Sequence, residues 1–255
     1  EGAQVVVEPI GTWICYLMHQ VVQRLHDHKG LAEGAIMPPK WRLDKHLRIN
    51  LAMYKKIAQL KIGEAIFKRE YHRIIEALGS LGHRLVDQYE LQRLAHPYYN
   101  SRAAGGEGHL EVAKNIYYSN KGLAHMVLAL KPFGCMPSTQ SDGAQSAVMS
   151  HYKDMIFLPI ETSGEGDVNA HSRVQMALGE AKAKTKLEFK AALDSTGRTV
   201  EEIREYVEAH PELASAMFKT PHAKGIVGGA ANYVLHVAEQ MKAEGWQPRR
   251  SSAAA

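Results

Sequence analysis

Cysteine is scarce in this chain, which has two among its 255 residues, Cys15 and Cys135. Two thiols so far apart in the sequence are not the disulfide framework of a small secreted domain. The chain also lacks any apolar run near the ~20 residues of a membrane-spanning helix, and its first residues do not resemble a signal peptide. These absences predict a protein of the reducing cytoplasm that has no membrane contact.

A strong charge of either sign is missing as well. The formal net charge is +4 and basic residues alternate with acidic ones along the chain, which argues against nucleic-acid binding. Apolar residues make up 45% of the sequence and charged residues 23%, the balance of a globular domain with its own core. A chain of this length can form one large domain or two small ones.

Three short apolar segments predict β-strands, at residues 3–7, 124–130 and 155–160, and Pro159 marks the end of the third or a sheet edge. Continuous apolar runs separated by helical patterns are typical of a parallel sheet covered on both faces. We therefore expect an α/β fold with a parallel, doubly wound (Rossmann- or flavodoxin-like) sheet in a domain over residues 1–195. Its helical insertion covers residues 41–94, and a helical extension follows over residues 196–255.

Helical patterns cover most of the remaining sequence. The segment 41–78 is expected to form two helices divided near residues 60–63, and Thr199 to Glu202 have the capping pattern of a helix start. Further helices are predicted at residues 13–28, 81–94, 107–120, 144–152, 168–193, 199–209 and 236–244.

The two ends of the chain differ in character. The chain has no initial Met and enters its first predicted strand at once. Because a chain rarely begins inside its own sheet, we expect further residues before Glu1 in a longer polypeptide. The segment PRRSSAAA, from Pro248 onward, has the composition of a frayed terminus.

The segment KPFGCMPST, residues 131–139, places Cys135 directly after the second predicted strand. Gly134 permits a tight turn, and Pro132 and Pro137 stiffen it. Ligands of parallel sheets bind beyond the carboxyl ends of the strands, where this loop should meet the loops EPIGTW and ETSGEGDVN. A thiol on a rigid loop before a helix N-terminus suits a metal ligand or a nucleophile.

Three roles stay open for Cys135 from the residues alone. The first is a small buried side chain, the usual role of a free cysteine and the one expected for Cys15. The second is a nucleophile, which needs a base that His96, His109 or His125 could supply. The third is a metal ligand. Because zinc and iron–sulfur sites use ~4 ligands, the others would then lie before the first residue or in another subunit.

Other motifs carry less information. GGEGH at residues 105–109 lacks the Lys of a P-loop, and HPYYN at residues 96–100 suits a surface turn. Arg173, near the start of a predicted helix, would be explained by an anionic partner. The fourteen histidines include no HxxxH or HExxH pair, so a zinc site made by this chain alone is not expected. Three acids after the third strand can line the site or cap the next helix: Glu161, Glu165 and Asp167.

KPFGCMPST, a helix, and then MIFLPIETSGEGDVNAHSRVQMALGEAK resemble the C-terminal block of the 2-hydroxyacyl-CoA dehydratase and benzoyl-CoA reductase component family. The order of Cys135, Glu161, Asp167 and Arg173 matches this block. The KPFG turn and the loop HPYYNSRAAGGEGH are most similar to the branch of CoA-enzyme activases and double-cubane cluster proteins. The resemblance is strongest over residues 96–182 and weaker over residues 1–28, and it does not extend beyond residue 193.

This resemblance implies a pair of stacked doubly wound domains in each subunit and an iron–sulfur cofactor. Cys135 would be the last of three cysteines that hold a 4Fe–4S cluster or half of a double-cubane cluster, with the other two upstream of the first residue. Five further residues would line the cofactor: Gly134, Pro137, Ser138, Glu161 and Arg173.

The resemblance also implies an activity and partners. An ATPase activator with its own cluster would supply electrons at low potential. The chain, in a dimer with an identical or related subunit, would then reduce or dehydrate a CoA thioester or another small substrate that is hard to reduce. That chemistry is an anaerobic oxidoreductase or lyase reaction. Two alternatives stay open: a non-catalytic docking domain of a large activase-like protein, and an acyl or thioester enzyme that uses Cys135 as nucleophile.

Overall fold

The computed structural model describes residues 2–32, 34–79, 84–103, 106–162 and 167–248. They form two compact units, Glu1–Ala113 and Lys114–Ala255, and the boundary falls within one helix, α4 (Gly108–Asn120). Within the described residues, no helix combines the length and the apolar character needed to cross a membrane.

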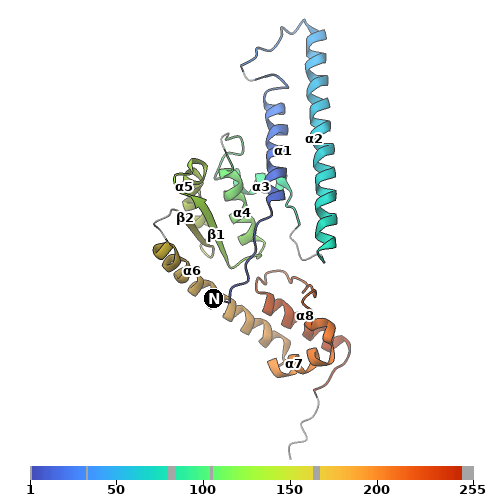
Figure 1. The fold of residues 1–255 in the computed structure, drawn as a ribbon, viewed down its shortest axis with the longest axis vertical. Coiled ribbons are helices and arrows are strands. Elements are labelled where there is room, and N and C mark those ends of the chain that lie inside the picture. The colour runs from blue at the N-terminus through green and yellow to red at the C-terminus, as the bar shows by residue number, and fades with distance from the viewer. Residues whose placement is uncertain (1, 33, 80–83, 104–105, 163–166, 249–255) are drawn as a thin grey trace, which may run out of the picture. The chain divides into compact units, whose positions relative to one another are not determined.

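The first unit contains the helices α1 (Ile10–Asp27), α2 (Leu43–Ala77) and α3 (Gln88–Ala95). α1 and α2 lie side by side (Figure 1), and α1 also packs against α3. The buried face of α1 repeats at helical spacing through Cys15, His19 and Val22. Cys15 is fully buried, as predicted, and burial raises the pKa of its thiol.

The strand predicted at residues 3–7 is wrong. Residues 2–9 form no regular element, and Val5 and Val7 are 77% and 76% exposed. A β-branched run becomes a strand only when another strand supplies its hydrogen bonds, and none of the described residues does so here.

The division predicted near residues 60–63 is also wrong, because α2 is one helix of 35 residues that continues through Gly63. A glycine inside a helix costs only about 1 kcal/mol relative to alanine. Lys61 and Lys68 both pair with Glu64, at 3.4 and 2.5 Å, so that ion pairs bridge the segment where the break was expected.

The second unit contains a parallel pair of strands, β1 (Met126–Pro132) and β2 (Ile156–Thr162), joined by α5 (Met136–His151). The strands pair from Met126↔Ile156 to Pro132↔Thr162. The α/β class with a parallel sheet is therefore confirmed, with two strands in the part of the chain that the structure describes. The predicted start of α5 at residue 144 is wrong by eight residues, because Pro137 fits the first turn of a helix.

The rest of the second unit is helical. α6 (Asp167–Thr196) packs against both strands and against α8 (Gly229–Ala243). α7 (Val200–Ala209) packs against α8 and the short 3-10 helix η1 (Pro211–Ala214). The predictions for α4, α6 and α7 are confirmed, whereas α8 begins seven residues before the predicted residue 236. Of the helix predicted over residues 81–94, residues 81–83 lie outside the described residues, residues 84–87 are not helical, and α3 begins at Gln88.

Candidate functional site

Cys135 lies at the carboxyl end of β1, in the turn that leads into α5. The turn is closed by a hydrogen bond of 3.2 Å from the Cys135 backbone N–H to the Pro132 carbonyl. Gly134 has φ +73, a left-handed conformation that residues with a side chain rarely adopt. No atom lies within 4 Å of a Cβ built at Gly134, so the turn needs glycine for its backbone conformation and not for space.

The thiol of Cys135 stands at the N-terminus of α5. Cys135 is the N-cap residue, and Pro137 and Ser138 are in the first turn of the helix. Ser138 is 2% exposed, and its Oγ donates a hydrogen bond of 3.3 Å to Cys135 Sγ. Cys135 itself is half-buried. The sulfur therefore lies beside a hydroxyl donor and at the end of α5 where backbone N–H groups have no partner within the helix.

A buried lysine underlies the same turn. Lys131, the residue of β1 before Pro132, is 4% exposed and forms an ion pair with Asp142 of α5. The Thr162 hydroxyl donates to the Lys131 carbonyl at 3.1 Å, which ties the ends of both strands together. Neither Lys131 nor Asp142 was predicted from the sequence as a site residue. In the sequence, the signal for this buried ion pair was a charged residue, Lys131, at the end of an apolar run and before a proline.

The acidic and basic residues predicted after β2 are only partly brought to this turn. Glu161 is exposed and pairs in register with Lys131 at the carboxyl ends of the strands. Arg173, on α6, donates a hydrogen bond of 3.0 Å from Nη2 to the Pro159 carbonyl, so its recorded acceptor is a peptide group of β2. Glu165 and the side chain of Asp167 lie outside the described residues.

His125 lies at the opposite end of the strands. It precedes β1, whereas Cys135 follows it, and a strand of seven residues is about 20 Å long. His125 Nε2 is 3.0 Å from Glu188 Oε2, and its Nδ1 is 3.2 Å from the Thr185 hydroxyl. It helps to line a cavity of about 670 Å³ with Tyr152 and Lys184. His125 is therefore not placed to act as the base for Cys135.

The chain fits an iron–sulfur cofactor only as the donor of one ligand. Among the described residues, no group of three or more His, Cys, Asp or Glu side chains is arranged to hold a metal ion. Cys135 supplies one half-buried sulfur that accepts a hydrogen bond, and a cluster takes one sulfur of this kind from each cysteine ligand. The remaining ligands have to come from outside these residues.

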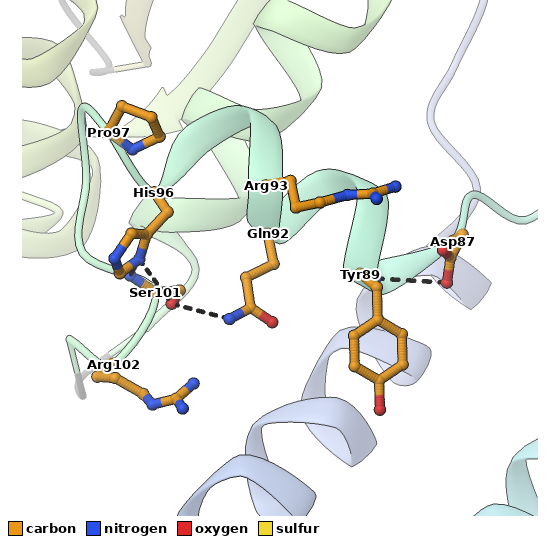
Figure 2. Close-up of a pocket in the computed structure, with 8 residues that line it drawn as sticks. All are labelled: Asp87, Tyr89, Gln92, Arg93, His96, Pro97, Ser101 and Arg102. Carbon is orange, nitrogen blue, oxygen red and sulfur yellow. Dashed lines mark hydrogen bonds between the residues drawn. The ribbon is translucent and has the colours of Figure 1, made fainter.

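The first unit has a pocket of its own, of about 800 Å³, along α3 and the following loop. Figure 2 shows His96 and Gln92 turned toward Ser101, with hydrogen-bond distances of 2.9 Å from His96 Nδ1 and 3.3 Å from Gln92 Nε2 to Ser101 Oγ. The HPYYN loop thus contributes a pocket wall at His96 and Pro97, beyond the surface turn that was predicted. Arg102 forms an ion pair of 2.6 Å with Asp27, which neutralises one cation at the rim.

Comparisons of the chain with protein-family models, with curated proteins and with solved structures find no match. The Cys135 turn and the parallel strands that carry it are therefore the structural features that bear on function.

Proposed function

We propose that this chain is the iron–sulfur component of an ATP-activated, low-potential reductase or dehydratase system. The substrate is a CoA thioester or another small molecule that is hard to reduce. The observation that carries the proposal is the position of Cys135, whose sulfur accepts a hydrogen bond from Ser138 at the N-terminus of α5 and the carboxyl end of β1. Ligand sites of parallel sheets lie at that end.

In this proposal Cys135 would be one cysteine ligand of the cofactor, and the residues around it would set the surroundings of its sulfur. A 4Fe–4S or double-cubane cluster supplies one-electron transfer at low potential when it is bound. Ser138 stabilises the thiolate by its hydrogen bond, and the Lys131–Asp142 pair holds the turn to α5. Gly134 and Pro137 define the backbone that aims the sulfur, and Glu161 and Arg173 are proposed to line the cofactor side of the strand ends.

The doubly wound sheet is part of the same proposal. A parallel sheet is normally covered on both faces, and two strands alone are only marginally stable. Leu128 and Leu130 of β1 are 41% and 65% exposed. These exposed leucines support further strands or helices, from elsewhere in a longer polypeptide, that complete the sheet. We also propose a cytoplasmic dimer with an identical or related subunit that is served by an ATPase activator with its own cluster.

A second candidate function is a docking domain without catalysis. Two apolar side chains flank the thiol and face solvent, with Phe133 74% exposed and Met136 66% exposed. Large exposed apolar side chains around a turn are suited to contact with another protein. On this alternative Cys135 packs in that contact and binds no iron.

The deciding experiment measures iron and acid-labile sulfide in the full-length protein purified without oxygen. Cys135→Ala is compared with the wild type, and Cys15→Ala, at the fully buried cysteine of α1, is the matched control. The proposal expects iron in the wild type and in Cys15→Ala, and a loss of most iron in Cys135→Ala. Iron-free wild-type protein, or equal iron in all three, contradicts the proposal and leaves the docking domain.

A further inference from the structure

α2 has two apolar faces, and only one of them is covered by α1. Met53 is buried against Gly30 at the end of α1, and Tyr71 lies against Gly11 near its start. The outer face carries large apolar side chains in contact with solvent over most of its length. These residues, which we name the outer stripe, are Leu43 (74% exposed), Leu47 (70%), Leu51 (69%), Tyr54 (60%), Ile62 (60%) and Ile66 (50%).

The outer stripe is long, and its first four members lie close to one line along the helix. Each residue of a helix turns the chain by about 100°, so its first four members fall within an arc of about 80° and all six within about 140°. A rise of about 1.5 Å per residue makes the stripe about 35 Å long. The first four members are spaced by three or four residues, and such spacing is typical of a helix that packs against another helix.

The charges beside the outer stripe are mostly positive. Residues 43–66 contain five Lys and Arg residues and two acids: Asp44, which pairs with Arg42, and Glu64, which pairs with Lys61 and Lys68. Four of these cations are exposed and form no recorded ion pair with any residue that the structure describes: Lys45, Arg48, Lys55 and Lys56. A partner that covers the stripe therefore meets an excess of positive charge along its border.

We propose that the outer stripe of α2 docks an amphipathic helix of a partner protein whose flanking residues are acidic. The stripe accepts the apolar face of that helix, and Arg48 and Lys55 pair with its carboxylates. A second copy of this chain would bring the same cations to the contact, so like charges would face each other. A lipid surface would have to take up Asp44 and Lys55 together with the stripe, because both lie within its arc of about 140°. Burying a charge without a partner is costly, whereas a partner helix can supply a carboxylate to Lys55.

The test uses the full chain and two synthetic helical peptides as long as the stripe. One has Leu at its core positions and Glu at the flanking positions, and the other has Lys in place of each Glu. Binding is measured by fluorescence anisotropy. We expect the Glu peptide to bind, and the Lys peptide to bind at least about tenfold more weakly. Salt should weaken binding of the Glu peptide because the paired side chains are exposed.

Variants locate the contact. Leu47→Ser with Leu51→Ser should weaken binding of the Glu peptide by about tenfold or more, and Lys55→Glu should weaken it by a smaller factor. Ile74→Ser is the control, because Ile74 is 60% exposed on the same helix but lies away from the stripe. All four substituted residues are solvent-exposed, and circular dichroism checks that the variants keep their helix content.

Three results overturn the proposal. The first is that both peptides bind with equal affinity, or that neither peptide binds. The second is a concentration-dependent dimer in sedimentation that Leu47→Ser with Leu51→Ser abolishes, which assigns the stripe to a second copy. The third is flotation with vesicles of phosphatidylcholine and phosphatidylglycerol that depends on the same two leucines, which assigns it to lipid.

Discussion

In the second unit, apolar side chains of α7, η1 and α8 pack against α6. In the first unit, by contrast, hydrogen bonds between polar side chains link α1 and α3. The apolar cluster consists of six buried residues, with Phe189 and Leu193 of α6 packed against it: Ile203, Tyr206, Leu213, Val234, Val237 and Met241. Its one polar group of note, the Tyr206 hydroxyl, donates to Glu244 at 2.8 Å. Burial and this carboxylate raise the pKa of Tyr206 to about 12.

The α1–α3 contact is organised around Gln92. Its Oε1 accepts a hydrogen bond of 2.6 Å from Gln23 Nε2 and lies 2.9 Å from His19 Nε2. His19 Nε2 is also 2.9 Å from Gln23 Nε2, so the tautomer of His19 decides which of the two it bonds. His109, at the start of α4, is 3% exposed and stacks on Tyr16 with ring centroids 6.2 Å apart.

The two contacts respond to different perturbations. Apolar packing depends on volume and hardly on pH, whereas a polar contact specifies one arrangement and depends on which groups carry protons. Burial lowers the pKa of His109 to about 4, and burial also lowers the pKa of His19. We therefore expect truncation to damage the second unit most and acid to damage the first.

The largest expected effect is truncation inside the apolar cluster. Met241 is fully buried, so Met241→Ala should lower the free energy of unfolding by about 2–5 kcal/mol, measured by urea titration. Met217→Ala is the matched control, because Met217 is 54% exposed and should change it by less than about 0.5 kcal/mol. Equal losses in both variants would contradict the assignment of the cluster as the core of this region.

Low pH should destabilise the first unit through His109. In the unfolded chain His109 takes up a proton near its ordinary pKa of 6.5, but in the folded chain it stays neutral down to about pH 4. The unfolded state therefore binds more protons in this window, and the free energy of unfolding falls as pH drops from 6.5 towards 4. By pH 4.5 the loss from His109 should be on the order of 2 kcal/mol.

Unfolding titrations at pH 7 and pH 4.5 check this expectation. His109→Phe keeps an aromatic ring against Tyr16 but cannot be protonated, so it should lose less stability over the same interval. His26→Phe, at an exposed histidine of α1, should keep the full wild-type loss. An identical pH dependence in all three proteins would mean that His109 is not the group responsible.

Gln92→Ala tests the polar contact without a change of pH. It leaves Gln23 and His19 without their shared acceptor, and an unsatisfied buried polar group should lower the free energy of unfolding by about 1–2 kcal/mol. Gln59→Ala, at an exposed position of α2, is the control and should be nearly neutral. Hydrogen exchange in α1 and α3 should become faster in Gln92→Ala, and unchanged exchange there would refute the role of Gln92.

The smallest effect is expected at the start of α7. Thr199 and Glu202 form a reciprocal capping box, with bonds of 3.2 Å to the Glu202 N–H and 2.9 Å to the Thr199 N–H. Thr199→Ala should cost about 1 kcal/mol of unfolding free energy, and Thr199→Ser should restore most of it because serine retains the hydroxyl. A loss of equal size in both variants would point to the Thr199 methyl group and not to the cap.

Some of the site was predictable because its signals are local. The turn at Gly134 and the position of Cys135 after a strand follow from residues within one loop, and both agree with the structure. The Lys131–Asp142 pair was not predictable, because the two residues are eleven positions apart on different elements. Their contact depends on the angle at which α5 leaves the turn, which no residue pattern states.

The sequence by itself determined the elements whose hydrogen bonds close within a few residues. The helix period of α4 and α6, the capping box of α7 and the apolar runs of β1 and β2 are all readable from neighbouring residues. Only the tertiary structure decided which segments found partners. Residues 3–7 found no strand to pair with, α2 stayed whole through Gly63, and His109 became buried against Tyr16. Strand pairing and burial depend on chain segments far apart in the sequence, and their energies are set only when the backbone brings them together.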